Sequence, residues 1–522
     1  MLNWAGFSGI DPVSMGAAAI AAKQGIKHSA QHAKRTTSMH APEKASHKAQ
    51  LHQMPASYFA SQLAQVHFGA KNQKEAPSIP IVDISGLFAN DNVGIKEKTA
   101  AFKLGQALTK KNGTGFVAVA MDAHEVGLTP EQLKAFSGQV QDFLSKGADY
   151  LNQFYEPKIL QQVGYQPNKA EKLDYKEAFH LPILESSFNA MTKPYSGDRE
   201  FQAFAQQVKT FMPAQKKVMN TLVRLFDVYF APVFKEKGLP VDYFQQMMGF
   251  TTPDGEYVDD GNHLLRMIKY PELTDDTFLN TAVTTDQKET PVVEEDGVRK
   301  FVRASAHDDM GFLTIIPEPS VPGLEVKTRD GQWISTYDSL QKAPADGKMR
   351  FVVNSGNMFK DATKGLLPDY EMLSTIHRVV STEDASTRQI RVALPLFVHP
   401  NHREPLMNID KGTPVEMHIK KGPFVGTTIN LGSKEGIFPF IAHQQFKRMN
   451  EYLEPIQEEL VEYGETPSGE DQVKVFHDFY EMGINMPEGY FGPKRPEEQS
   501  VRELFDATKG STGESINYIS AS

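Results

Sequence analysis

The chain has 522 residues, of which 40% are apolar and 23% are charged, and it contains no cysteine. This composition is typical of a globular protein with one large or two modest domains, and no apolar run reaches the roughly 18 residues that a membrane-spanning helix needs. Without cysteine there are no disulfides, thiolate nucleophiles, iron–sulfur clusters or cysteine-ligated zinc. Any bound metal would therefore be held by His, Asp and Glu.

The net charge of −10 is unevenly distributed along the chain. Residues 1–75 carry eight Lys or Arg against three acidic residues, so this segment is basic and the remainder is strongly acidic. Nucleic-acid phosphates require clustered Lys and Arg, which an acidic body does not offer. We therefore expect no nucleic-acid partner. Because no apolar run is long enough to span a bilayer, we also expect no membrane partner.

Residues 1–76 are rich in Ala, His, Ser and Lys, which is typical of a mobile or loosely helical tail. Three roles are open for this tail: a solubilising extension, an organelle-targeting segment, or an arm for secretion or partner binding. The tail has one Arg and lacks the order of regions that defines a signal peptide. The sequence thus favours a cytoplasmic location.

The folded body is predicted to begin near residue 77 with a largely helical region, residues 77–261. Apolar spacing predicts, in chain order, a strand at Ile79–Ser85, a helix at Glu97–Lys111, a strand at Gly113–Val119, and amphipathic helices at Thr129–Leu151 and Arg199–Lys237.

The pattern changes in residues 262–400, where short apolar runs alternate with Gly, Pro and Asp. Strands are predicted at Leu264–Tyr270, Gly311–Ile316, Leu324–Lys327, Phe351–Asn354 and Ile390–Val398, which indicates a sandwich or barrel. The polar, acidic stretch Thr274–Lys300 is predicted to be an inserted loop or hairpin over this core. Residues 401–522 form a C-terminal extension with a predicted helix at Ala442–Gly464.

A candidate metal site lies in this strand-rich part. His307 and Asp309 are two residues apart, and His377 follows 68 residues after Asp309. Residues two apart on a strand share a face, so His307 and Asp309 can point at one metal, to which a distant strand brings His377. Two imidazoles and one carboxylate form a facial triad, which favours Fe(II) and leaves positions open for a cosubstrate and O₂. Zinc in a hydrolase can use the same ligand types.

The sequence around these residues resembles the isopenicillin N synthase-like branch of the 2-oxoglutarate/Fe(II)-dependent dioxygenases. Nine segments carry the resemblance in order: Ile79–Ser85, Gly115–Val117, Asp174–Phe179, Leu265–Pro271, His307–Thr314 as H-x-D-x-G-x-L-T, Val321–Val326, Val353–Met358, His377–Val379 and Arg391–Phe397.

The resemblance implies a mixed α/β protein with an all-β core, namely a double-stranded β-helix (jelly roll) flanked by α-helices. It implies that His307, Asp309 and His377 bind Fe(II), and that 2-oxoglutarate and O₂ are cosubstrates. By the same resemblance Arg391 pairs with the distal carboxylate of 2-oxoglutarate, as a planar guanidinium can, and Tyr270 donates its hydroxyl to the same molecule.

Three departures from the family pattern affect the cosubstrate end. The family's serine two residues after the arginine is Ala393 here, which removes a hydrogen bond of about 1.5–3 kcal/mol to a charged group. Ile268 stands where some members have asparagine. The spacing from His377 to Arg391 is fourteen residues, which suggests an enlarged hairpin at Ser381–Thr387 and makes Arg388 a rival for the carboxylate.

The resulting hypothesis is an oxygenase that hydroxylates, desaturates or cyclises a small organic molecule. The alternatives are an Fe(II) oxidase of the same fold that does not use 2-oxoglutarate, and a metal-binding interaction protein whose extensions contact a protein partner. The extensions also fit an enzyme whose substrate is a protein. Residues 274–300 and 401–440 are candidate lids.

Several other polar residues near the motifs are given structural roles. Lys176 and Glu177 are expected to form ion pairs, and Gly323, Asn354 and Gly356 are expected to be turn residues. His263, His399, His402 and His418 lack metal-ligand spacing and are expected to be surface or core polar groups.

Overall fold

The computed structural model describes residues 78–88, 94–155, 163–167, 175–249, 263–274, 292–295, 297–319, 321–342, 346–401, 406–418 and 428–430. The predicted tail at 1–76, the predicted helix Ala442–Gly464, His402 and most of both candidate lids lie outside these residues. The division into four regions given above therefore stays a prediction.

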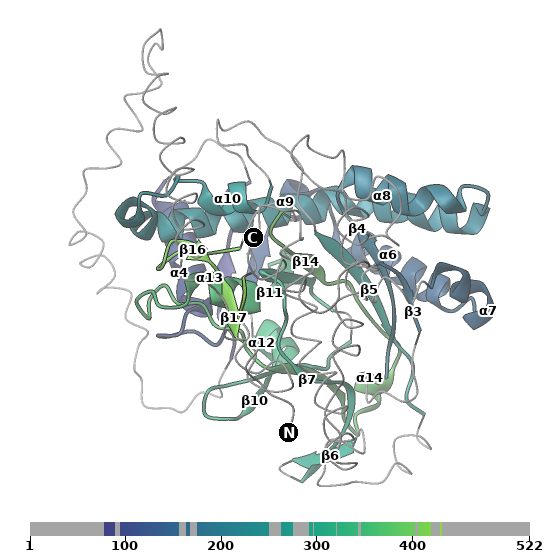
Figure 1. Ribbon diagram of the computed structural model, residues 1–522. Coiled ribbons are helices and arrows are strands. Elements are labelled where there is room, and N and C mark those ends of the chain that lie inside the picture. Colours follow the sequence, from purple (N-terminus) through teal and green to yellow (C-terminus); the bar gives the residue numbers. More distant parts are fainter. Residues whose placement is uncertain are drawn as a thin grey trace, which may run out of the picture. The chain divides into compact units, whose positions relative to one another are not determined.

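Two β-sheets form the core, a major sheet of nine strands and a minor sheet of five (Figure 1). In spatial order the major sheet consists of β1 (Ile81–Asp83), β2 (Phe116–Met121), β11 (Met349–Ser355), β8 (Leu313–Pro317), β14 (Leu396–Val398), β5 (Leu264–Tyr270), β4 (Glu177–Pro182) and β3 (Gly164–Gln166), with β13 (Arg391–Ala393) also paired to β5. The minor sheet consists of β10 (Trp333–Ser335), β9 (Leu324–Lys327), β12 (His377–Ser381), β7 (Val298–His307) and β6 (Val292–Glu295).

From β5 onward the chain passes back and forth between the two sheets. Strands β5, β8, β11 and β13–β14 lie in the major sheet, and β7, β9–β10 and β12 lie in the minor sheet. Their pairings are antiparallel. This crossing pattern is the jelly roll, so the predicted double-stranded β-helix is confirmed.

Alternation along β2 shows how the layers are arranged. Val117, Val119 and Met121 join a core that also contains residues of the helices, whereas Phe116 and Ala118 join a second core shared with the minor sheet. Successive strand residues point to opposite faces, so β2 contributes to both cores at once. The second core is thus the interior of the jelly roll, and we call it the barrel interior.

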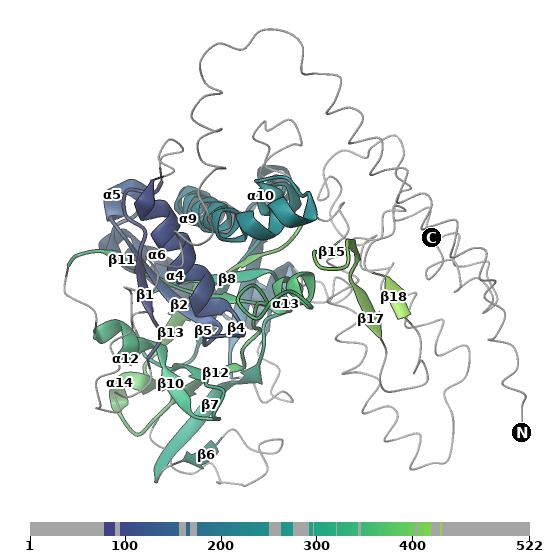
Figure 2. The same ribbon diagram turned by 90° about the vertical axis from the view of Figure 1, so that its left-hand side faces the viewer.

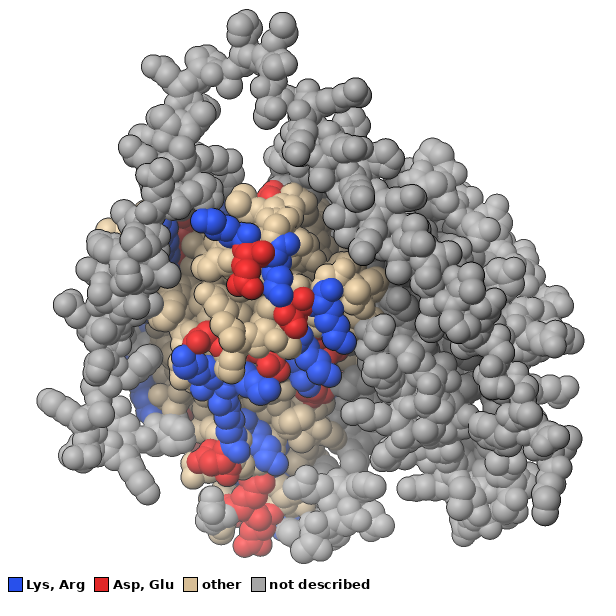
Figure 3. All heavy atoms as spheres, turned by 60° about the vertical axis from the view of Figure 1, so that its left-hand side comes forward, with Lys and Arg blue, Asp and Glu red and all other residues tan. Residues whose placement is uncertain are grey.

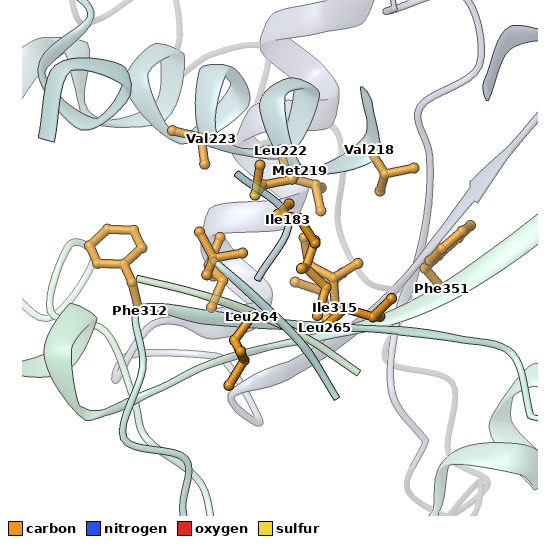
Figure 4. Close-up of a cluster of buried hydrophobic side chains, with 14 of the residues drawn as sticks. Ile183, Val218, Met219, Leu222, Val223, Leu264, Leu265, Phe312, Ile315 and Phe351 are labelled. Carbon is orange, nitrogen blue, oxygen red and sulfur yellow. The ribbon is translucent and has the colours of Figure 1, made fainter. Parts of the chain in front are cut away.

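The helices cover the other face of the major sheet (Figure 2). They are α4 (Ile95–Leu108), α5 (Ala123–Val126), α6 (Pro130–Leu144), α7 (Ala148–Leu151), α8 (Glu185–Thr192), α9 (Arg199–Lys237) and α10 (Tyr243–Met247), with short 3-10 turns η1 (Asn152–Phe154) and η3 (Lys193–Tyr195). Figure 4 shows Val218, Leu222 and neighbouring residues of α9 facing Leu265 of β5 and Ile315 of β8. This apolar packing fixes the sheet that carries Tyr270 and Arg391.

Caps explain where two of these helices begin. The prediction of Arg199–Lys237 as a helix is confirmed, and the side chain of Asp198 caps its start by accepting from two backbone N–H groups. The predicted helix Thr129–Leu151 is instead divided. Thr129 and Gln132 form a capping box at its start, but α6 ends at Leu144, and Gly147 has a left-handed φ of 91° before α7.

Three short helices and two small hairpins complete the described chain. They are α12 (Thr336–Gln341), α13 (Asn357–Thr363), α14 (Ala385–Arg388), the pair β15 (Met407–Asn408) and β16 (Thr413–Pro414), and the pair β17 (Glu416–His418) and β18 (Thr428–Asn430).

The predicted insert Thr274–Lys300 contains a hairpin where it is described, because β6 pairs with the start of β7. A partly buried ion network holds this hairpin to the minor sheet. Arg378 donates to both Glu295 and Glu325, and Lys300 pairs with the same two carboxylates. The Arg378 guanidinium also lies 4.0 Å from the ring centre of Trp333. The hairpin is thereby tied to the residue that follows the predicted ligand His377.

Over the described part of the chain, no helix combines the length and apolar composition required to cross a bilayer. Figure 3 shows one face on which Lys and Arg side chains lie beside Asp and Glu side chains. Exposed pairs of this kind include Lys110 with Glu371 and Lys111 with Asp369. Exposed pairs of this type each contribute little to stability, about 0–1 kcal/mol.

Candidate metal centre

The fold brings His307, Asp309 and His377 together. His307 is the last residue of β7 and His377 the first of β12, and these two residues are partners in the antiparallel register. Their ring centroids are 4.4 Å apart. One ligand atom from each of the three residues lies within 4.8 Å of the other two. The three residues, which we call the metal site, can therefore hold one ion.

The route by which Asp309 reaches this site differs from the prediction. We expected His307 and Asp309 to share a face of one strand, but β7 ends at His307 and Asp309 lies in the loop before β8. Strand alternation therefore does not position Asp309. Hydrogen bonds from neighbouring strands do so instead.

The Asp309 carboxylate is oriented by two buried donors. Thr314 Oγ1 donates to Asp309 Oδ2 at 2.6 Å, and Asn354 Nδ2 donates to the same oxygen at 2.7 Å. The other oxygen, Oδ1, lies 3.7 Å from His377 Nε2. The carboxylate is thus held by one oxygen and presents the other toward the histidines, as metal ligands with supporting hydrogen bonds do.

Both histidines are oriented through their Nδ1 atoms. His307 Nδ1 donates to the Ser305 carbonyl at 2.6 Å, and His377 Nδ1 donates to the Thr375 carbonyl at 3.1 Å. A carbonyl oxygen can only accept, so Nδ1 carries the proton in each ring. In the neutral ring the Nε2 lone pair is then available for a metal.

The protonation states suit metal binding. Loss of solvation, and then the proximity of His377, lower the pKa of His307 to about 4, although part of this residue is exposed. Burial raises the pKa of Asp309, but the two histidines and the bonds from Thr314 and Asn354 outweigh it and hold the pKa at about 2. At neutral pH the site therefore offers a neutral imidazole at His307 and an ionised carboxylate.

A close backbone approach holds the loop that carries Asp309. The Asn357 amide, at the start of α13, donates to the Asp309 carbonyl at 2.8 Å. A Cβ at Gly356 would lie 2.2 Å from the Gly311 carbonyl oxygen and 2.9 Å from that of Asp309. Gly356 is therefore required by this approach and is not simply a turn residue.

Arg391 and Tyr270, the two residues predicted to contact 2-oxoglutarate, lie together on paired strands. Arg391 of β13 is 2% exposed, is the register partner of Tyr270 of β5, and its guanidinium centre lies 5.1 Å from the tyrosine ring centre. Arg391 Nε donates to the Val321 carbonyl at 3.3 Å. Ala393 and Ile268 are register partners in the same barrel interior, so the two family positions that changed here add only apolar surface.

The predicted enlarged hairpin at Ser381–Thr387 is wrong. Strands β12 and β13 belong to different sheets, and the segment between them crosses the barrel edge through the short helix α14. Arg388 is the last residue of α14, whereas Arg391 lies on a strand of the barrel wall. The crossing accounts for the long spacing and favours Arg391 over Arg388.

Asn354 does not have its predicted role, and no role was predicted for Arg303 from the sequence. Asn354 was predicted to be a turn residue, but it lies in β11, is fully buried and orients Asp309. A polar residue that ends a β-branched run was the available signal. Arg303, also fully buried, lies near Tyr270, and its position four residues before His307 offered no comparable signal.

Glu177, His263 and His399 have structural roles. Glu177 pairs with Lys269 at 2.9 Å and accepts from Tyr165, which fits the expected structural ion pairing. His263 and His399 are buried, and the His399 amide donates to His263 Nδ1 at 3.3 Å.

Residues 262–400 match the model of the 2OG-Fe(II) oxygenase superfamily. A Dictyostelium discoideum protein named probable iron/ascorbate oxidoreductase is 28% identical over 38% of this chain and 44% of its own length. Scopoletin 8-hydroxylase of Arabidopsis thaliana is 32% identical over 19% of this chain and 23% of its own length. The matches thus span less than half of each curated relative.

Solved structures also resemble the chain. A full-length Neurospora crassa protein in complex with alpha-KG and thymine aligns with a TM-score of 0.47 and 18% identity, covering 71% of this chain and 98% of that one. The Arabidopsis thaliana dioxygenase for auxin oxidation 1, in complex with 2-oxoglutarate, aligns with a TM-score of 0.40 and 16% identity, covering 62% and 92%.

Proposed function

We propose that the chain, whose residues 262–400 belong to the 2OG-Fe(II) oxygenase superfamily, is an Fe(II)- and 2-oxoglutarate-dependent oxygenase that oxidises a small organic molecule. One observation carries the proposal. His307, Asp309 and His377 converge within the part of the chain that matches this superfamily.

The donor set fits Fe(II). Two imidazoles and one carboxylate occupy one side of an ion and leave adjacent coordination positions open, which is the arrangement of non-haem Fe(II) oxygenases. The hydrogen bonds donated by Nδ1 of both histidines, and the two hydrogen bonds that Asp309 Oδ2 accepts, fix the three ligands before any ion arrives. Such fixed ligands lose little freedom when a metal binds.

When bound, Fe(II) with 2-oxoglutarate supplies the oxidative chemistry, in which O₂ oxidises the substrate while the keto acid becomes succinate and CO₂. The residues of this chain bind and orient. His307, His377 and Asp309 Oδ1 would hold the ion. The guanidinium of Arg391 would pair with the distal carboxylate of 2-oxoglutarate, and the hydroxyl of Tyr270 would donate to the same molecule.

Apolar side chains of the barrel interior keep water away from His377, Tyr270 and Arg391. Phe116 contacts the His377 ring edge to face, with centroids 5.3 Å apart, and Val326 and Val379 of the minor sheet belong to the same cluster as Tyr270. A dry surrounding strengthens the attraction between a buried guanidinium and a carboxylate. It also limits side reactions of the oxidant with solvent.

The proposed substrate is a small organic molecule, and hydroxylation, desaturation and cyclisation are all open as outcomes. The name of one curated relative, scopoletin 8-hydroxylase, describes hydroxylation of such a molecule. A cytoplasmic location is proposed from the composition of residues 1–76 alone.

The test is production of succinate by the full chain supplied with Fe(II), 2-oxoglutarate, O₂ and a panel of small aromatic and heterocyclic compounds. We expect succinate to form in step with an oxidised product, and His307→Ala to abolish both. Tight Fe(II) binding without any consumption of 2-oxoglutarate across the panel would instead support an oxidase of the same fold that needs no keto acid, or a metal-binding interaction protein.

A further inference from the structure

A second buried arginine lies beside the proposed cosubstrate end. Arg303 of β7 and Arg391 are both among the largest fully buried side chains. Arg303 Nη1 donates to the Gln389 carbonyl at 3.2 Å, and Nη2 donates to the carbonyl of Pro271. Gln389 precedes Arg391 by two residues and Pro271 directly follows Tyr270. Arg303 therefore ties together, from the opposite sheet, the two strand ends on which Arg391 and Tyr270 pair.

A β-bulge turns Arg303 inward. In the pairing of β7 with β12, Ala304 is the partner of Val379 and Val302 is the partner of Val380, so Arg303 is an extra residue without a partner in the register. The extra residue breaks the alternation, and Arg303 and Ala304 are both buried although they are neighbours in a strand. Bulges that redirect a side chain in this way are common beside active sites.

Both arginines lie over the same aromatic ring. The guanidinium centre of Arg303 is 5.8 Å from the ring centre of Tyr270, and that of Arg391 is 5.1 Å from it. The negative face of the ring attracts each cation. The two cations also repel each other. Burial, and then this repulsion by Arg391, lower the pKa of Arg303 to about 10. We call Arg303 and Arg391 the arginine pair.

The arginine pair has no acidic partner among the residues that the structure describes. Two other arginines in the described part of the chain do have one: the buried Arg378 binds two glutamates, and the partly buried Arg224 binds Glu97. In the described part of the chain, Nη1 of Arg391 and Nε of Arg303 also have no hydrogen-bond partner. Two buried cations without a counter-ion are costly, so their presence indicates an anionic ligand.

We propose that Arg303 is a positioning residue for the distal carboxylate of 2-oxoglutarate at Arg391, an inference that rests on the proposed function. Arg303 contacts Tyr270 and binds the backbone carbonyls of Pro271 and Gln389, and its charge adds to the field that attracts the carboxylate. This second charge acts where Ala393 cannot supply a hydroxyl.

The test compares two keto acids in calorimetric titrations of the anaerobic, Fe(II)-loaded full chain. One is 2-oxoglutarate, and the other is 2-oxopentanoate, which has the same chain length without the distal carboxylate. We expect Arg303→Met to weaken binding of 2-oxoglutarate about tenfold, the effect of removing one charge-assisted interaction, and to leave 2-oxopentanoate unchanged. Arg303→Lys keeps the charge without the planar fork, so we expect a loss of about threefold on 2-oxoglutarate only.

Each other result overturns the inference in a recognisable way. Equal weakening of both keto acids, or lower Fe(II) affinity, would assign Arg303 a general role in holding the fold. Unchanged binding of both keto acids by Arg303→Met would show that Arg391 acts without it. Should Arg303→Met fail to fold, the lysine variant gives the same comparison. Failure of the wild-type chain to bind 2-oxoglutarate would instead remove the proposed function, and this inference with it.

Discussion

At the metal site, the described ligand atoms are held by hydrogen bonds within the chain, whereas the arginine pair lies buried with no acidic partner among the described residues. Asp309 receives two donors, and each histidine has its Nδ1 fixed by a carbonyl. The ligand residues of the metal site are thus in position before a metal ion binds. The arginine pair instead keeps an uncompensated charge, which a carboxylate would neutralise. The fold thus supplies fixed ligand positions at the metal site and positive charge at the arginine pair.

The largest expected effect is on 2-oxoglutarate binding when Arg391 is removed, and this change distinguishes the two regions. Arg391→Met should weaken 2-oxoglutarate binding about 100-fold, because a buried charge-assisted pair contributes about 3 kcal/mol, while Fe(II) affinity stays unchanged. Anaerobic titration with each ligand measures both. Arg388→Met is the matched control and should bind 2-oxoglutarate as the wild type does. If Arg388→Met shows the larger loss, the carboxylate has been assigned to the wrong arginine.

The next effect tests whether the metal site is prepared by its supporting bonds. Thr314→Val and Asn354→Ala each remove one donor to Asp309 Oδ2, and each should weaken Fe(II) binding about tenfold, as changes in residues that support metal ligands do. Thr314→Ser retains the hydroxyl and serves as the control. Unchanged Fe(II) affinity in both variants would mean that the loop backbone alone orients Asp309.

A third variant examines an arginine whose charge is compensated. Glu295→Gln removes one of the two carboxylates that bind Arg378 and should lower the free energy of unfolding by about 1–2 kcal/mol at pH 7, since Glu325 remains. The hydrogen bond from Arg378 lowers the pKa of Glu295. Its contribution is therefore complete above the ordinary glutamate pKa and is lost as the pH falls through the lower folded value.

Urea unfolding of the wild type and Glu295→Gln across this range measures the effect. The difference between the two proteins should shrink as the solution is made more acidic than the ordinary glutamate pKa. A difference that does not change with pH would show that the pair contributes through packing rather than charge.

The smallest effect adds a donor beside the arginine pair. Ala393→Ser restores the hydroxyl that the family pattern contains and should tighten 2-oxoglutarate binding about threefold, less than a full hydrogen bond because the wild-type pair already binds the carboxylate. Titration with 2-oxopentanoate is the control and should show no change. A weaker affinity for 2-oxoglutarate would indicate that the buried hydroxyl finds no acceptor.

Much of the fold could be predicted because its elements carry strong local signals. Leu264–Tyr270, Leu324–Lys327 and Arg199–Lys237 have the predicted bounds, since apolar periodicity and caps are local properties. Errors arose where the outcome depends on distant segments. The crossing at Ser381–Thr387 is an example, because strand pairing between sheets decides both the path and its length, whereas the break after Leu144 follows from the local conformation at Gly147.

The sequence by itself determined the residue types and order of the metal site, His307, Asp309 and His377, because side-chain chemistry and flanking motifs are properties of the local sequence. Only the tertiary structure decided how they meet. The register of β7 with β12 joins the histidines, and hydrogen bonds from β8 and β11 orient the aspartate. The tertiary structure also placed Arg303 over Tyr270, since a β-bulge redirects a side chain without leaving a pattern in the sequence.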